Sequence, residues 1–374
     1  MSTRYSKKYK GENIMKIIPI GTPEIVMSNP MSKHKYFGWP TVNRLQNGKI
    51  AVVASGFRRR HVCPFGKAVI SYSEDEGKTY TMPAPVIDTV LDDRDAGIVP
   101  FGEKSVIVTS FNNTVQFQRK STRPYDVAYL DLVTPEEEEE ALGSTFRISH
   151  DYGVTFGPLH KCPVTSPHGP VVLPDGTLLW VGRTFSPSNI HRKGIDGVHA
   201  YKINLDGTTE FVGKVPAIME GEIEPLLCEP HAIVLKDGRI LTHIRAHAAG
   251  TDLFSTYQSE SSDGGKTWTT PVRILDWKGG APAHLMYHSS GALISVYGYR
   301  NAPYGVRAMI SFDDGKTWDV DHDIYVNGIS HDLGYPSTIE LSDGTLLTVF
   351  YARPSEDDFA TVIMQQRWTF TTEE

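Results

Sequence analysis

Six stretches of the chain share one alternation of apolar and polar positions. Each has two short runs of apolar and β-branched residues around a tight turn, as in residues 337–351, where Ser342-Asp343-Gly344 separates the runs. Asp-Gly between such runs predicts a β-hairpin. The turns stand at positions 48, 104, 176, 238, 291 and 344, at separations of 56, 72, 62, 53 and 53 residues. The chain therefore contains a six-fold internal repeat.

The repeat predicts an all-β fold, namely a six-bladed β-propeller of four-stranded antiparallel blades. After each hairpin come a variable loop, a third strand, a turn and a fourth strand, which is the strand order of one blade. The last repeat has only one later strand, at residues 360–370. An early apolar strand at residues 16–27 can complete this blade and close the ring, so that no sheet edge stays open.

We expect a disordered lead over residues 1–12 and a single propeller domain over residues 13–374. The 33 Gly and 24 Pro favour short strands and turns over long helices. The one acidic run, residues 136–140, lies in the longest repeat and is expected to be a solvated loop or a short helix.

Composition and charge narrow the range of functions. With 37 Lys plus Arg against 44 Asp plus Glu the net charge is −7, and no basic run is long enough for a nucleic-acid groove. Cys63, Cys162 and Cys228 have neither disulfide-like nor zinc-like spacing. The sequence shows no secretion signal and no apolar run of about 18 residues, so we expect a cytoplasmic protein without membrane contact. Nothing requires a cofactor.

A second motif recurs late in the repeats. It reads SEDEGKTY (73–80), SHDYGVTF (149–156), SSDGGKTW (261–268) and SFDDGKTW (311–318), with a weaker copy at 204–208. The Asp can accept backbone N–H groups within a turn, the Gly tolerates a positive φ, and the aromatic residue packs between strands. These motifs are Asp boxes, and with them the chain resembles the sialidase superfamily of six-bladed propellers. That scaffold hosts several activities.

Connectivity sorts the loops between two faces. The Asp boxes and the first hairpin turns share one face, so the other face collects the starts of the first strands and the loops between second and third strands. Arginines in this set predict an anionic ligand, aromatic residues suit a sugar, and histidines can act as acid or base. No local motif makes the histidines a metal site. The set comprises Trp39, Asp95, His168, Glu229, His231, His284, Tyr335, Arg58, Arg59, Arg60, His61, Asn112, Asn113, Arg183, Arg245, His247, Arg300, Tyr304, Arg307 and Arg353.

The resemblance implies roles for some of these residues. In sialidases three arginines hold the substrate carboxylate, and a tyrosine polarised by a glutamate is the nucleophile. By position, Tyr335 in GYPSTIELSDG resembles that nucleophile and Glu229 in EPHAIVLKDGRILTHIR its partner. Arg245, which closes the same hairpin, and Arg307, which precedes an Asp box, resemble two of the arginines. Asp95 resembles an acid that contacts the sugar.

The first repeat departs from the sialidase pattern. Phe37-Gly38-Trp39-Pro40 stands where an Arg-Ile-Pro type motif is expected, and the acid/base aspartate is missing from residues 58–66. We expect Arg58 and its neighbours to restore the positive charge. His61 or Asp93 is expected to take over proton transfer.

Three functions remain open. The first is a sialidase-like exo-glycosidase that hydrolyses a terminal acidic sugar from an oligosaccharide, with Tyr335 as nucleophile. The second is a lyase acting on uronic-acid oligosaccharides through His or Tyr and Arg. The third is a non-catalytic carbohydrate-binding propeller, against which a hydrogen bond between Glu229 and Tyr335 would count.

Overall fold

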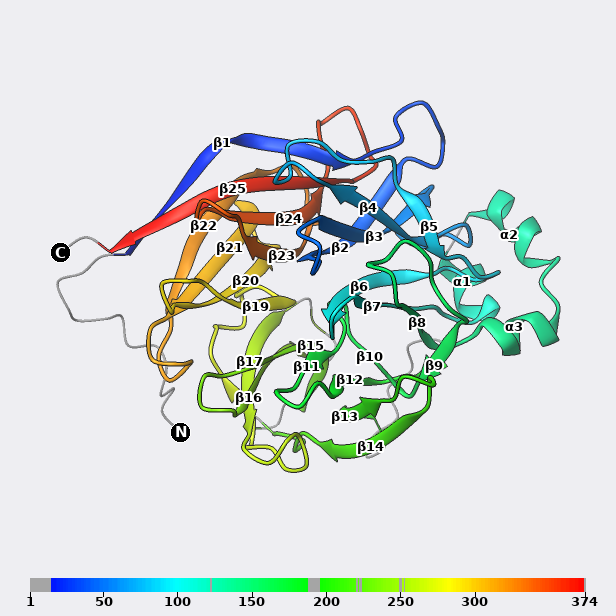
Figure 1. Ribbon diagram of the computed structural model, residues 1–374. Coiled ribbons are helices and arrows are strands. Elements are labelled where there is room, and N and C mark those ends of the chain that lie inside the picture. The colour runs from blue at the N-terminus through cyan, green and yellow to red at the C-terminus, as the bar shows by residue number, and fades with distance from the viewer. Residues whose placement is uncertain are drawn as a thin grey trace.

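The computed structural model describes residues 15–121, 123–187, 196–219, 221, 224–248, 251 and 253–372. Six antiparallel sheets surround a common centre (Figure 1). This confirms the predicted six-bladed propeller. The expected lead at residues 1–12 lies outside the described residues. Among those described, no helix has the length and apolar character needed to cross a membrane.

The strands follow the sheet order from the centre outwards, and in blade 3 both β10 and β11 pair with β12. Blade 1 contains β2 (Tyr36–Arg44), β3 (Ile50–Arg58), β4 (Lys67–Ser73) and β5 (Ala84–Ile87). Blade 2 contains β6 (Arg94–Phe101), β7 (Ser105–Phe111), β8 (Ser144–Ser149) and β9 (His160–Cys162). Blade 3 contains β10 (Val164–Thr165), β11 (Val171–Val172), β12 (Leu178–Thr184), β13 (Val198–Ile203) and β14 (Thr209–Lys214). Blade 4 contains β15 (Pro225–Val234), β16 (Ile240–Ala248), β17 (Phe254–Ser261) and β18 (Val272–Arg273). Blade 5 contains β19 (Ala283–Tyr287), β20 (Leu293–Tyr299), β21 (Tyr304–Ser311) and β22 (Asp319–Gly328). Blade 6 contains β23 (Gly334–Glu340), β24 (Leu346–Ala352), β25 (Val362–Thr372) and β1 (Met15–Met27).

The early strand closes the ring as predicted. β1 pairs antiparallel with β25, from Met15 opposite Thr372 to Met27 opposite Ile363, and so becomes the outer strand of blade 6. The last blade is therefore built from two distant parts of the chain.

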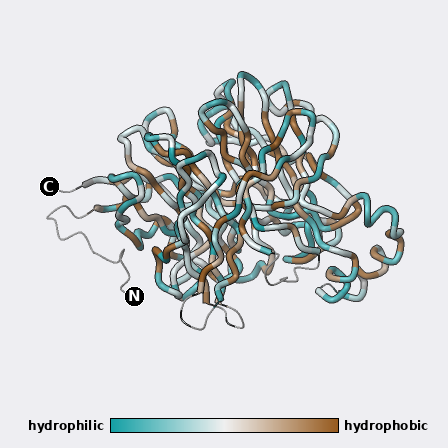
Figure 2. Tube along the Cα trace, turned by 90° about the horizontal axis from the view of Figure 1, so that it is seen from below, coloured by the Kyte–Doolittle hydropathy of each residue, from teal (hydrophilic) through white to brown (hydrophobic). Residues whose placement is uncertain are grey.

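Apolar residues fill the spaces between neighbouring blades. Six buried clusters are found among the described residues, and each joins two adjacent blades, such as blades 6 and 1 through Leu347 and Val42. Hydrophobic residues run along the strands, whereas the peripheral loops are mainly hydrophilic (Figure 2). Since removing apolar surface from water drives folding, the contacts between neighbouring blades stabilise the ring.

The Asp boxes form the turns between third and fourth strands, as expected. In the box at 261–268, Asp263 accepts from the backbone N–H of Thr267 at 2.9 Å and from its hydroxyl at 2.6 Å. Ser261 Oγ accepts from Gly265 N at 2.9 Å. Gly265 has φ of 92°, and a Cβ there would lie 2.8 Å from Leu179 of the preceding blade. The box thus fixes its own turn and lets neighbouring blades approach closely.

Three short helices interrupt blade 2 between β7 and β8. They are α1 (Val115–Ser121), α2 (Pro124–Leu130) and α3 (Pro135–Ala141), and they project at one side of the ring (Figure 1). The acidic run begins α3, where Thr134 and Glu137 form a capping box. The short-helix alternative of the sequence analysis is the observed one. The three cysteines are buried and form no disulfide.

Candidate active site

Four non-glycine residues at the starts of first strands adopt left-handed backbone conformations. They are Trp39, Asp95, Glu229 and Tyr335, with φ of 54°, 49°, 48° and 48°. In each case the strand pairing shifts register at this residue. A left-handed non-glycine residue costs about 1–2 kcal/mol, and such residues concentrate at functional sites. The kinks belong to blades 1, 2, 4 and 6 and bring side chains distant in sequence together at the channel.

Tyr335, Glu229 and Arg245 form one hydrogen-bonded group. The Tyr335 hydroxyl donates to Glu229 Oε1 at 2.8 Å, and Arg245 Nη1 donates to Glu229 Oε2 at 2.7 Å and to the Tyr335 oxygen at 3.2 Å. Burial opposes ionisation of Glu229, but the charge of Arg245 outweighs it and lowers the pKa of the carboxyl. Burial raises the pKa of Tyr335 well above 10, and the charge of Glu229 adds to this. The group therefore pairs a phenol with an ionised carboxylate able to take its proton.

Asp95 lies beside this group. Burial raises its pKa to about 7, with Arg94 opposing the shift and Glu229 adding to it. Its Oδ1 is buried without a hydrogen-bond partner among the described residues. Asp95 lines a cavity of about 160 Å³ together with Glu229, Arg245 and Arg183 of β12. A carboxyl that is partly protonated near neutral pH thus faces the cavity.

His61 lies in the loop after β3. Its Nδ1 is 3.2 Å from Asp332 Oδ1 and 3.2 Å from the Tyr36 hydroxyl, and its side chain is 50% exposed. Burial lowers the pKa of His61, whereas the bond to Asp332 raises it. The imidazole lines a hollow of about 490 Å³ with Tyr36, Arg59 and Asp332. His61 is therefore a titratable group at the rim of the channel.

Of two predicted arginines in blade 5, Arg300 lies near Tyr335 and Arg307 pairs with acidic residues of β22. Arg300 donates from Nε to the Leu333 carbonyl and from Nη2 to the Tyr351 hydroxyl, both at 2.9 Å, and its guanidinium lies 5.5 Å from the Tyr335 ring. Arg307, expected to hold the substrate, instead pairs with Asp323 at 2.8 Å and Asp321 at 3.2 Å on β22, over the ring of Tyr299. The placement of Arg307 at the site is wrong, because its position on β21 directs it to the neighbouring outer strand.

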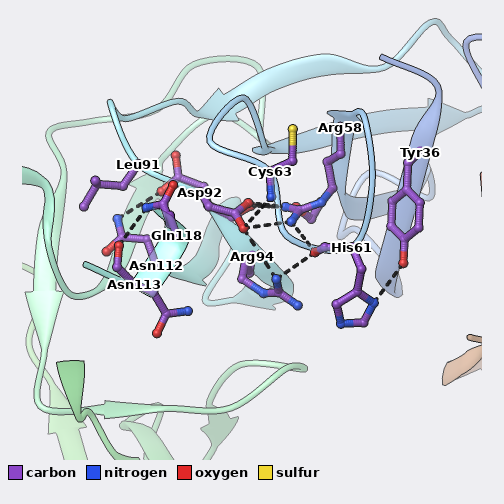
Figure 3. A network of polar contacts seen from close by, with 12 residues as sticks. Tyr36, Arg58, His61, Cys63, Leu91, Asp92, Arg94, Asn112, Asn113 and Gln118 are labelled. Atoms are coloured by element: carbon purple, nitrogen blue, oxygen red, sulfur yellow. Dashed lines mark hydrogen bonds and ion pairs between the residues drawn. The ribbon is translucent and has the colours of Figure 1, made fainter. Parts of the chain in front are cut away.

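The arginines of the first blade do not line the channel as expected. Arg58 is completely buried and pairs with Asp92 at 2.5 Å (Figure 3). Arg59 and Arg60 pair with Asp126 of α2 at 2.7 and 3.0 Å, so they turn towards the helical insertion. The expectation that Arg58 contacts substrate fails because it is buried against Asp92, whereas Arg59 and Arg60 line the hollow that also contains His61.

The expected role of Asp93 in proton transfer does not fit its position. Its carboxylate accepts from Thr89 N at 2.7 Å, from the Thr89 hydroxyl at 3.0 Å and from Asn112 at 3.3 Å, and the residue is completely buried. These bonds anchor the loop before β6. Asp93 therefore has a structural position and is no candidate for proton transfer.

The three histidines lie further along the channel than predicted. The His231 and His284 rings stack 4.5 Å apart, and His168 lies 5.4 and 5.0 Å from them. His231 Nδ1 accepts from Leu285 N at 2.9 Å, and His284 Nδ1 accepts from Thr338 N at 3.4 Å. Each bond joins one blade to the next. The rings line a cavity of about 360 Å³ that is distinct from the one lined by Glu229 and Arg245.

Trp39 and Tyr304 are held by packing. Trp39 is only 1% exposed, and its ring lies 5.0 Å from His61 and 6.4 Å from Tyr335. Tyr304 packs between blades 5 and 6. The burial of Trp39 leaves no open ring face for a sugar, contrary to expectation, although Trp39 lies beside Tyr335.

Two further residues near Tyr335, Arg94 and Asp332, were not predicted from the sequence. Arg94 Nη1 donates to the His61 carbonyl at 2.8 Å, and the guanidinium lies 4.2 Å from the centre of the Trp39 ring. Asp332 accepts from Tyr36 at 2.9 Å and from Tyr351 at 3.2 Å in addition to its contact with His61. Both residues flank predicted ones, Asp95 and Tyr335. The available signal was their position next to the starts of first strands.

Comparisons with known proteins place this geometry in context. The model of the BNR repeat-like domain family matches residues 108–348. No curated protein matches the chain. A protein of unknown function from Dyadobacter fermentans is 19% identical, with a TM-score of 0.74 over 96% of this chain and 99% of that one.

Two sialidase structures are also similar. The NanB sialidase from Streptococcus pneumoniae is 13% identical, with a TM-score of 0.61 over 94% of this chain and 71% of its own. The intramolecular trans-sialidase from Ruminococcus gnavus is 14% identical, with a TM-score of 0.62 over 93% of this chain and 97% of its own. At such identities the likeness shows a common fold. Because the family match spans more than half of the sequence, the chain belongs to the BNR repeat-like domain family.

Proposed function

We propose that the protein is a sialidase-like exo-glycosidase that hydrolyses a terminal, carboxylate-bearing sugar from an oligosaccharide. The observation that carries this proposal is the 2.8 Å hydrogen bond from the Tyr335 hydroxyl to Glu229. A phenol is a weak nucleophile while protonated, and a partner that accepts its proton removes this obstacle. The sialidase structures with the same fold support sugar as the class of substrate.

In the first step, the Tyr335 oxygen bonds to the anomeric carbon while the glycosidic C–O bond breaks. Glu229 receives the phenol proton, and the leaving oxygen receives a proton from His61, the half-exposed acid at the rim. In the second step His61 takes a proton from water, whose oxygen displaces Tyr335, and Glu229 returns the proton to the phenol. Two displacements retain the anomeric configuration.

The charges of the group fit these roles. The lowered pKa of Glu229 keeps this carboxylate ionised and ready to accept a proton. The pKa of His61 lies below 6.5, so the protonated acid is depleted as pH rises. We therefore expect kcat/KM to fall above mildly acidic pH.

Arginines supply the preference for an acidic sugar. Arg245 and Arg300 both act electrostatically on the Tyr335 phenol, and Arg183 lines the same cavity as Glu229. Guanidinium groups bind carboxylates bidentately, so an anionic sugar is favoured over a neutral one.

The two other functions receive less support. A binding protein has no use for a phenol joined to an ionised carboxylate. The lyase alternative drew on a histidine-rich mouth, but the stacked histidines line the other cavity. A lyase would be recognised by an unsaturated product.

The test is sugar release from 4-methylumbelliferyl glycosides of sialic acid, its deaminated relative, glucuronic acid and neutral sugars. We expect release from an acidic glycoside, lost in Tyr335→Phe and retained in Tyr304→Phe, a tyrosine variant between blades 5 and 6. Equal activity of Tyr335→Phe and wild type would overturn the mechanism. Absence of release from every glycoside, with an unsaturated product formed from uronic-acid oligosaccharides, would establish the lyase instead.

A further inference from the structure

Blade 1 presents an indole where the sialidase pattern has an arginine. Trp39 occupies the left-handed position at the start of β2. Two guanidinium groups lie against its ring, Arg94 at 4.2 Å and Arg58 at 4.8 Å from the ring centre. Planar guanidinium groups stack well on aromatic rings. The positive charge at this position therefore comes from the arginines packed on the neutral ring of Trp39.

The two arginines share one carboxylate (Figure 3). Arg58 pairs with Asp92 at 2.5 Å, whereas Arg94 lies 3.4 Å from the same carboxylate. The side chains of Arg58 and Asp92 are 0% and 1% exposed, so each neutralises the other inside the protein. One positive charge is left over, and it belongs to Arg94, which is 10% exposed.

The two arginines also differ in how many of their N–H groups are already used in hydrogen bonds. Arg58 also donates to Ser55 Oγ and to the His61 carbonyl, both at 2.7 Å. Among the described residues, the hydrogen bonds of Arg94 use Nη1 alone. Its Nε and Nη2 are left for a ligand. Arg58 is thus a buried structural residue, and Arg94 is the arginine with N–H groups available to a ligand.

The ring of Trp39 lies between Arg94 and Tyr335 in the contact network: it is 4.2 Å from the Arg94 guanidinium and 6.4 Å from the Tyr335 ring. The positive charge of Arg94 favours the ionised form of Tyr335, as do the charges of Arg245 and Arg300. These three arginines start from blades 2, 4 and 5. Asp95 is the other acid near Arg94, and burial favours its neutral form. An anion above Tyr335 would therefore meet positive charge from three sides.

We propose that Arg94 binds the carboxylate of the substrate sugar together with Arg245 and Arg300, while Trp39, Arg58 and Asp92 hold it in place. This inference rests on the proposed function, since it assigns the acidic group of that substrate to a residue of blade 2. The acidic sugar is thus recognised by a clamp in which an arginine of β6 replaces one of β2.

The experiment compares Arg94→Gln and Arg94→Lys with wild type, using the acidic glycoside that wild type cleaves and its methyl ester. A charge-assisted hydrogen bond is worth about tenfold to a hundredfold in affinity. We expect Arg94→Gln to raise KM for the acid by this factor and to change KM for the ester less than twofold. Arg94→Lys should give a smaller rise, because lysine keeps the charge but loses the planar fork. Arg307→Gln, altered on the outer strands, should match wild type.

Equal changes for acid and ester, or no change for either, would overturn the role of Arg94. If Arg94→Gln does not fold, the acid-to-ester ratio of Arg94→Lys decides the matter. Failure of the proposed function is seen separately, as absence of cleavage by wild type. In that case calorimetric binding of free sialic acid, its deaminated relative and glucuronic acid tests Arg94. Binding weakened at least tenfold in the variant supports the role, and no binding to wild type, or equal binding, contradicts it.

Discussion

Tyr335 of β23 and Glu229 of β15 are 106 residues apart in sequence, and their side chains meet in a hydrogen bond of 2.8 Å. Both residues have left-handed backbones, with φ of 48°. Blades 4 and 6 therefore contribute the two members of one hydrogen-bonded pair, and each residue is held in a conformation that an unconstrained strand would not adopt.

Replacing Glu229 tests this pair from the side of the base. We expect Glu229→Gln to lower kcat by roughly 10²–10⁴-fold, since the amide keeps the shape of the carboxylate but cannot take the phenol proton. Steady-state kinetics on the cleaved acidic glycoside measures the effect. Glu340→Gln, on the opposite side of the ring from the mouth, serves as the control. A kcat within threefold of wild type in Glu229→Gln would remove Glu229 from the mechanism.

Asp332→Asn is expected to shift the pH profile. The bond to Asp332 raises the pKa of His61 against the effect of burial, so its loss lowers that pKa further. The protonated acid is then depleted at lower pH, and the falling limb of kcat/KM moves towards acid. His61→Ala should lose this limb and most of the activity. An unchanged limb in Asp332→Asn would show that another group donates the proton.

Asp95 is expected to make stability depend on pH. Its pKa is about 7 in the folded protein and about 4 in an unfolded chain. Between these values the folded state binds a proton that the unfolded state has lost, so the stability contributed at low pH disappears as pH rises through 7. Asp95→Asn, which does not titrate, should gain stability over wild type by up to about 3 kcal/mol between pH 5 and pH 8. Urea unfolding at both pH values measures this gain, and an equal difference at both would contradict it.

Asp92→Asn should destabilise the protein by about 3–5 kcal/mol, because it leaves the buried guanidinium of Arg58 without its counter-charge. Urea unfolding provides the measurement. Asp323→Asn removes a partner of Arg307 that is about half exposed and should cost no more than about 1 kcal/mol. Similar losses in both variants would mean that the Asp92 network carries no special share of the stability.

The sequence predicted the fold because its signals are local. The hairpin turn at Gly344 and the Asp box around Asp263 specify their turns by φ and by hydrogen bonds within a few residues. The hairpin recurs six times, and a ring of six blades is the arrangement that leaves no sheet edge open. The pairing of β1 with β25 followed from counting strands.

The site could be predicted only in part. Tyr335, Glu229 and Arg245 were found through the resemblance to sialidases. Between Asp92 and Asp95, however, the left-handed turn decides which side chain reaches the channel, and strand alternation does not reveal it. Arg58 was misplaced because Asp92, which holds it, comes from another segment of the chain.

The pairing of β1 with β25 has a consequence for the order of events during synthesis. Blade 6 carries Tyr335, yet it reaches its full width only when a strand made early meets one made late. Contacts between such distant segments form slowly, since the loop they close is nearly the whole chain. A nascent chain that already contains Glu229, Arg245 and Tyr335 would therefore still lack a firmly held nucleophile. The first and last strands of the chain thus complete the blade that carries Tyr335.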